Sequence, residues 1–276
     1  MMTTLFPLRL RLRGPRTCAT AAVIVVTALT SSASPWENMS TGLFNEAHAE
    51  FTKLEKAPGA DLRSLRYGDA VSLLNIQPRT QSNIEKAYQI FEELHAAAPA
   101  DDLGLESRYM QGRIEHAQRA TPDLQKAEAI FSELVKSHPN HPASQRAQVK
   151  LAIIRLYAKI DATERRSRYD GFTVAASQLQ DAGAKVQMHL LLADVARRFD
   201  YGEAEQLNHM LAAEKAGVTK RRLRGDVLVR IGDLARLTGK NDLAATYYTQ
   251  FLAEFPRTDR RTTVENYLAA FNASKK

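Results

Sequence analysis

The stretch that decides the fold covers residues 224–258 and reads RGDVLVRIGDLARLTGKNDLAATYYTQFLAEFPRT. Its first half repeats apolar residues at the spacing of one helical face, at Leu228, Ile231 and Ala235. Its second half does the same, at Ala244, Tyr248, Phe251 and Phe255. Pro256 ends the second helix because proline has no amide proton to donate. Residues 239–241 form the turn, so the stretch predicts an antiparallel helix pair that crosses closely at Gly232 and Ala244.

An internal repeat extends this pattern toward the N-terminus. Residues 86–94 (KAYQIFEEL) match residues 126–134 (KAEAIFSEL), 40 positions later. Three alanines each precede a helix-ending proline by twelve residues: Ala87 before Pro99, Ala127 before Pro139 and Ala244 before Pro256. A repeat of this length with a helix pair in each unit is typical of an α-solenoid.

The best-formed unit resembles the tetratricopeptide repeat family. The residues that carry the resemblance are Gly232, Gly239, Ala244, Tyr248 and Pro256. The resemblance implies an all-α solenoid of about six antiparallel helix pairs that binds a protein or peptide partner and has no enzymatic chemistry of its own.

The resemblance also implies a binding surface, since ligands of this family commonly lie on the concave face made by the first helix of each pair. In the best unit that face would carry Asp226, Val229, Asp233 and Arg236. In the unit before Ala127 it would carry Glu106, Tyr109, Arg113 and His116.

Residues 34–276 read as one helical repeat domain of about 12 helices. A capping box is expected at residues 82–85, and Thr121 and Pro122 are expected to start a later helix. Residues 163–181, 185–199 and 203–216 look helical, and about two degenerate pairs fit between Ala127 and Ala244. Residues 259–272 read as a closing helix that covers the last pair.

The sequence contains no pattern that predicts an enzyme, a metal site or a cofactor. His138 and His141 lie in a proline-rich turn without a carboxylate or thiolate close in sequence to complete a metal site, so a turn between units is the favoured interpretation. His189 and His209 are interpreted as packed or half-exposed helix residues. The single cysteine, Cys18, leaves residues 34–276 without a disulfide or thiolate chemistry.

Residues 1–33 are predicted to be a cleaved signal peptide. They carry four arginines and no acidic residue, and residues 18–29 form an apolar run. As a helix this run would span about 18 Å, short of the ~30 Å of a membrane core. Cleavage is expected after Ala33, which fits the small-residue pattern of signal peptidases. A membrane anchor formed by residues 18–33 and a mitochondrial presequence are the alternatives.

The charge balance argues against a nucleic-acid ligand. The whole chain has a net charge of +7, but residues 34–276 contain 34 basic and 31 acidic side chains and so have a net charge of only +3. The basic runs 165–168 and 220–224 leave a binder of nucleic acid or anionic lipid as one alternative.

The motif FLAEFP at residues 251–256 is similar to that of periplasmic repeat proteins of bacterial envelopes, of the β-barrel-assembly lipoprotein or Tol–Pal coordinator type. Together these features predict an exported, periplasmic or secreted adaptor; a membrane-anchored envelope assembly factor is the other alternative. No small-molecule substrate is expected.

Overall fold

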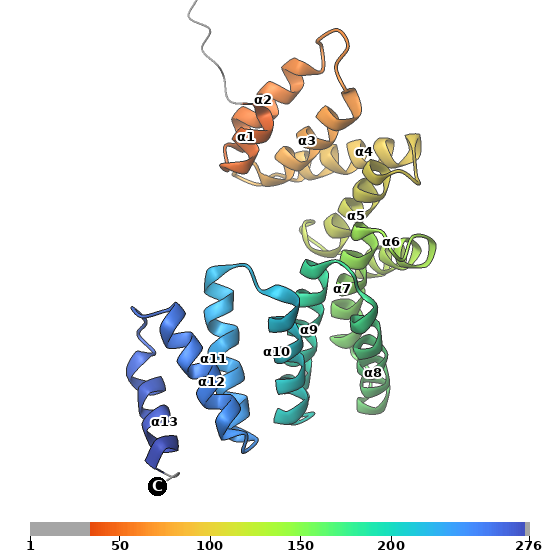
Figure 1. Cartoon of the computed structure of the whole chain (residues 1–276). Coiled ribbons are helices and arrows are strands. Elements are labelled where there is room, and N and C mark those ends of the chain that lie inside the picture. The colour runs from red at the N-terminus through yellow and green to blue at the C-terminus, as the bar shows by residue number, and fades with distance from the viewer. Residues whose placement is uncertain (1–33, 274–276) are drawn as a thin grey trace, which may run out of the picture. The chain divides into compact units, whose positions relative to one another are not determined.

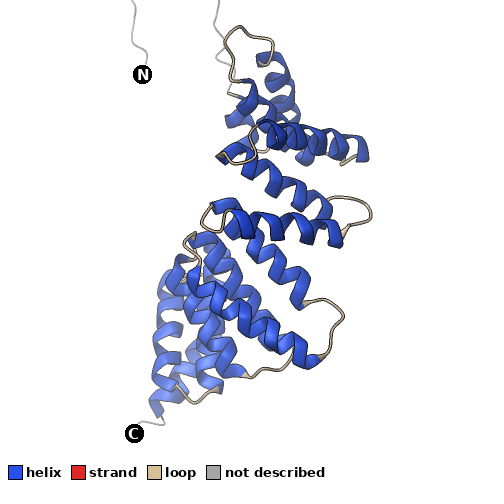
Figure 2. Cartoon of the chain, turned by 90° about the vertical axis from the view of Figure 1, so that its right-hand side faces the viewer, coloured by secondary structure: helices blue, strands red, loops and turns tan. Residues whose placement is uncertain are grey.

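The computed structural model describes residues 34–273, and this part of the chain is built from thirteen α-helices without a β-strand (Figures 1 and 2). The predicted signal peptide, its cleavage after Ala33 and the alternative anchor at residues 18–33 lie outside the described residues. None of the helices described is long and apolar enough to cross a membrane.

The helices follow one another along the chain with short connections. In order they are α1 (Pro35–Ser40), α2 (Phe44–Leu54), α3 (Leu62–Asn75), α4 (Gln81–Ala97), α5 (Asp102–Ala117), α6 (Leu124–Ser137), α7 (Pro142–Leu156), α8 (Ala162–Gln178), α9 (Ala182–Arg198), α10 (Glu203–Gly217), α11 (Arg221–Leu237), α12 (Asn241–Glu254) and α13 (Arg261–Ala273). Each helix packs on the next, which gives six antiparallel pairs and a last helix that covers α12. The predicted all-α solenoid of about six pairs with a closing helix is therefore confirmed.

Some of the helix pairs cross where a glycine of one helix receives an aromatic ring of its neighbour. Gly232 on α11 lies against the Tyr248 ring of α12, and a Cβ atom there would be nearer the ring than two carbon atoms can approach. Gly112 on α5 meets Phe131 of α6 in the same way. The close crossing predicted at Gly232 is thus confirmed, and its cause is a ring that fills the space of the missing side chain.

The repeated alanines mark equivalent core positions in three units. Ala87, Ala127 and Ala244 are all fully buried. Four residues later in each unit, one turn along the helix, stands a buried aromatic residue: Phe91, Phe131 and Tyr248. The 40-residue sequence match therefore reports the same helix contact made in successive units.

Two predicted helix starts are wrong. The helix expected to begin with a capping box at residues 82–85 begins at Gln81, because the Thr80 hydroxyl accepts the Asn83 amide at 3.2 Å. The helix expected to begin at Thr121 and Pro122 starts at Leu124, capped by the Asp123 carboxylate. In both places a nearby oxygen accepts a free amide of the first turn.

The count of about 12 helices misses α1. The Ser34 hydroxyl accepts the Glu37 amide at 3.2 Å, and Pro35 occupies the first helical position. Trp36 of this short helix makes an edge-on contact with the Phe51 ring of α2, with the ring centres 4.9 Å apart. The two degenerate pairs expected in the middle are present as α7–α8 and α9–α10.

Candidate functional site

A groove lies between α11 and α13 and has a volume of about 500 Å³. We call it the α11–α13 groove; it is lined by Asp226, Val229, Arg230, Asp233, Arg260, Thr263, Val264 and Tyr267. Three of the four partner-binding residues predicted on α11 are in this set. The fourth, Arg236, lies beside the groove with its guanidinium group 4.4 Å from the centre of the Tyr267 ring.

The two carboxylates of the α11–α13 groove are held differently. Asp226 forms an ion pair with Arg260 of the α12–α13 connection at 2.9 Å, and both side chains are about half exposed. Asp233 accepts a hydrogen bond of 2.6 Å from the buried Tyr248 hydroxyl. Burial raises the pKa of Tyr248 and the Asp233 carboxylate raises it further, so this hydroxyl remains a donor to Asp233. The groove therefore offers one exposed ion pair and one fixed carboxylate.

The second predicted set lies on α5, on the side that faces α7. We call this surface the α5–α7 face; it consists of Glu106, Tyr109, Arg113, His116, Arg146 and Lys150. Glu106 forms an ion pair with Arg146 of α7. The Arg146 guanidinium also lies over the Tyr109 ring, 5.0 Å from its centre. The sequence hints at this pairing, because Arg146 follows Glu106 by the 40-residue repeat offset.

Two cations of the α5–α7 face lack an acidic partner among residues 34–273. Arg113 donates only to the Met110 sulfur at 3.3 Å, and half-buried Lys150 forms no ion pair. Burial lowers the pKa of Lys150, and the charge of Arg113 lowers it further. The pKa of His116 is lowered by burial and then by Lys150. Positive charge thus accumulates at Arg113 and Lys150 without compensation by a carboxylate of residues 34–273. Lys150 is not among the residues that the sequence predicts for this surface.

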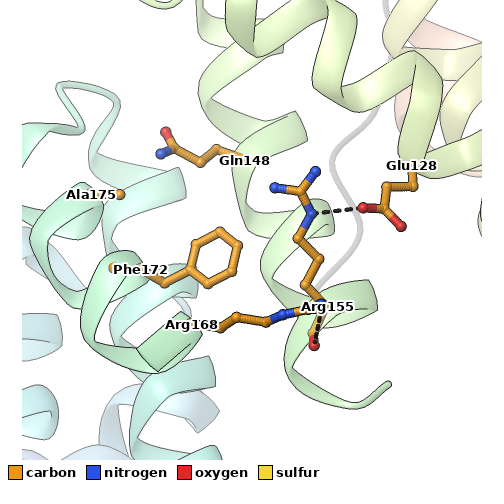
Figure 3. Close-up of a pocket in the computed structure, with 7 residues that line it drawn as sticks. Glu128, Gln148, Arg155, Arg168, Phe172 and Ala175 are labelled. Carbon is orange, nitrogen blue, oxygen red and sulfur yellow. Dashed lines mark hydrogen bonds and ion pairs between the residues drawn. The ribbon is translucent and has the colours of Figure 1, made fainter. Parts of the chain in front are cut away.

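A second cavity, of about 510 Å³, lies between α6, α7 and α8 (Figure 3). We call it the α8 pocket; it is lined by Glu128, Gln148, Arg155, Arg168, Gly171, Phe172 and Ala175. Arg155 donates to Glu128 at 2.7 Å, and Arg168 donates to the Arg155 carbonyl at 3.1 Å. Sequence reasoning missed this pocket because its walls come from three helices, of which α8 shows no clear apolar periodicity.

The histidines occupy ordinary structural positions or pair with each other. His141 caps α7 by accepting the Ala143 amide at 3.2 Å, in the turn that the sequence predicts. His189 of α9 and His209 of α10 lie side by side, with their Nδ1 atoms 3.1 Å apart. The sequence placed both in packed helices but did not predict their contact. Within the described residues, no group of three His, Cys, Asp or Glu side chains is arranged to hold a metal ion.

The basic runs are largely occupied by contacts within the chain. Arg165 donates to three carbonyls at the end of α7 and in the connection that follows, those of Leu156, Ala158 and Ile160. Arg166 pairs with Asp170 and Glu205. In the second run, Arg224 pairs with Glu214 and Glu254. The charges of Arg166 and Arg224 are therefore compensated by carboxylates of the chain, and Arg165 stabilises the end of α7.

A model of the tetratricopeptide repeat family matches residues 226–258, which span most of α11 and all of α12. The fold is a tetratricopeptide-like α-solenoid. No curated protein matches the chain. Tetratricopeptide repeats generally bind protein or peptide partners and typically act as interaction scaffolds rather than enzymes, so the α11–α13 groove and the α5–α7 face are read as candidate binding surfaces.

Proposed function

We propose that this protein is an exported, non-enzymatic adaptor that binds an acidic polypeptide segment on its α5–α7 face. The observation that carries the proposal is the pair of cations, Arg113 and Lys150, which have no acidic partner within residues 34–273. A half-buried charge without a counter-ion is costly, and a carboxylate of a partner would remove that cost. The neighbouring Tyr109 ring supplies apolar surface for the same segment.

The two other lines of support concern the compartment and the second surface. The basic, acid-free N-terminus with an apolar run favours export after cleavage at Ala33. The α11–α13 groove extends the possible contact, and its Asp226–Arg260 pair is open to exchange with charged groups of a partner. The FLAEFP motif at residues 251–256 favours an envelope protein of the β-barrel-assembly or Tol–Pal coordinator type.

Binding can be tested with two labelled peptides of equal length, one rich in glutamate and the other with glutamine in its place. The purified protein should bind the glutamate peptide, and the double variant Arg113→Ala/Lys150→Ala should bind it roughly tenfold more weakly. Lys86→Ala, which removes an exposed lysine of α4, is the matched control and should leave binding unchanged. Equal binding of both peptides would contradict the proposal.

The same assay separates the alternative ligands. A DNA duplex and vesicles containing anionic lipid should bind weakly, because most arginines of the basic runs are already paired. Tight binding of either, unaffected by Arg113→Ala/Lys150→Ala and lost steeply with added salt, would instead identify a basic-face binder of nucleic acid or lipid.

Export is tested by N-terminal sequencing of the protein from fractionated cells. A chain that begins at Ser34 in the soluble extracytoplasmic fraction is the expected result. An intact Met1 in the membrane fraction would make residues 18–33 an anchor. An intact chain in the cytoplasm would contradict export.

A further inference from the structure

The α8 pocket lies on the opposite side of α7 from the α5–α7 face. Gln148 and Arg155 point into the pocket, whereas Arg146 and Lys150 belong to the face, and these pairs stand on opposite sides of a helix with 3.6 residues per turn. Figure 3 shows Phe172 reaching from α8 toward α7, with the Arg155 guanidinium entering the same space from α7. The pocket is therefore a second, separate surface.

One wall of the pocket is a glycine in the middle of α8. Glycine in a helix interior is unfavourable, so such a position calls for a reason in packing or binding. At Gly112 and Gly232 the reason is an aromatic ring from the neighbouring helix. At Gly171 a Cβ atom would meet nothing within 4 Å among the described residues. The space beside Gly171 is thus open, whereas an aromatic ring of the neighbouring helix fills the corresponding space beside Gly112 and Gly232.

The side chains around Gly171 are also short of aromatic partners. Many arginines of this chain lie over a ring, for example Arg165 at 4.1 Å from the centre of Phe199. Within residues 34–273, Arg155 and Arg168 lie over none, and the half-buried Phe172 ring, which packs against two core clusters, forms no ring-to-ring contact. Guanidinium groups and ring edges attract the faces of aromatic rings.

We propose that the α8 pocket binds an aromatic side chain, tryptophan in preference to others, from a partner polypeptide. The ring lies on the exposed backbone at Gly171, beside Phe172, with the guanidinium of Arg155 or Arg168 against its face. Tryptophan is preferred because its ring binds cations most strongly. The Gln148 side-chain amide, which forms no hydrogen bond with the described residues, faces the same space and can both donate to and accept from the partner backbone.

This inference rests on the proposed function only in assuming a polypeptide partner, and it uses different residues. The probes are the blocked peptides Ac-Ala-Trp-Ala-NH2 and Ac-Ala-Leu-Ala-NH2, titrated into the full-length protein and followed by amide chemical shifts. The tryptophan peptide should shift the amides of Gly171 and Ala175 and bind at least roughly fivefold tighter than the leucine peptide. Free tryptophan should bind more weakly, because it lacks the blocked backbone that Gln148 recognises.

Two leucine variants of α8 provide the decisive comparison. Gly171→Leu fills the pocket and should abolish the shifts, whereas Ser177→Leu adds the same side chain at an exposed position outside the pocket and should preserve them. Thermal melting of both variants checks that α8 remains folded. Arg113→Ala/Lys150→Ala should bind the tryptophan peptide normally, so a failure of the acidic-peptide proposal is recognised separately.

Four results would overturn the inference. The first is equal affinity for the tryptophan and leucine peptides, and the second is unchanged binding by Gly171→Leu. The third is self-association that Gly171→Leu abolishes, which would make a second copy of the chain the occupant. Equally tight binding of free tryptophan would likewise replace the polypeptide by a small molecule.

Discussion

Replacing a helical glycine by alanine is expected to change the free energy of unfolding in opposite directions at two positions, depending on what occupies the space beside each glycine. At Gly232 the Tyr248 ring fills that space, so Gly232→Ala should lower the free energy of unfolding by about 1–3 kcal/mol through overpacking. At Gly171 the space is open, so Gly171→Ala should raise it by about 0.5–1 kcal/mol through helix propensity. Urea denaturation of both variants checks the two signs, and a loss of stability in Gly171→Ala would contradict the open environment described for α8.

The His189–His209 contact makes stability depend on pH. Burial and then the neighbouring His189 lower the pKa of His209 to about 4, although Glu205 opposes the shift. The ordinary value is 6.5, so below that pH the unfolded chain binds more protons than the native one. The free energy of unfolding is therefore not reduced by His209 above pH 6.5, and it decreases as the pH falls from 6.5 toward 4.

We expect His209 to cost about 2 kcal/mol of stability between pH 7.5 and pH 5. Carboxylates also titrate at low pH, so the measurement is the difference between the native chain and His209→Gln in urea denaturation at both pH values. His189, whose pKa is also lowered by burial and by Lys185, contributes in the same direction. An identical pH dependence in the variant would show that His209 does not titrate in this range.

At the level of helices, one buried glutamine fixes the connection between α8 and α9. The Gln145 side-chain oxygen accepts the amides of Gln180 and Asp181 at 2.7 and 2.6 Å, and its nitrogen donates to the Asn140 carbonyl. Gln145→Leu would leave these amides without a partner. We expect a loss of about 1–3 kcal/mol in stability and faster hydrogen exchange at residues 180 and 181. Unchanged exchange there would mean that the connection is held by other contacts.

Local patterns predicted the helices better than their exact starts. Periodicity located α11 and α12 because their buried apolar residues belong to one core cluster. The starts at Gln81 and Leu124 were misplaced because several polar side chains in a row can cap a helix, and only the folded chain shows that Thr80 and Asp123 do so. The α8 pocket and the His189–His209 contact escaped prediction since they join helices whose relative rotation no sequence pattern specifies.

Across the whole described chain, each helix contacts only helices one or two places away. Stability in such an array is a sum of neighbouring contacts. Removing residues 259–276 takes away α13, whose Val264 and Phe271 are buried in the same core as Tyr248. Hydrogen exchange should then become faster in α11 and α12 but remain unchanged in α3–α6. Loss of protection throughout the chain would indicate a single cooperative unit.

The sequence predicted only some of the residues that form the two candidate surfaces. The tetratricopeptide pattern singled out Asp226, Val229 and Asp233, which line the α11–α13 groove. It could not identify Lys150, because the residues predicted for the second surface came from α5 alone, nor show that Arg113 lacks a counter-ion among residues 34–273. Whether either surface binds a partner remains a prediction that the peptide assays address.

Contacts between near neighbours also govern how the chain folds in time. Within residues 34–273, no helix packs on a helix more than two places away along the chain. Little conformational entropy is therefore lost in closing loops before native contacts form. Chains with such low contact order fold quickly. The first helix pairs can therefore acquire their structure while the later ones are still being synthesised, and α13, the last of the described helices, then covers α12.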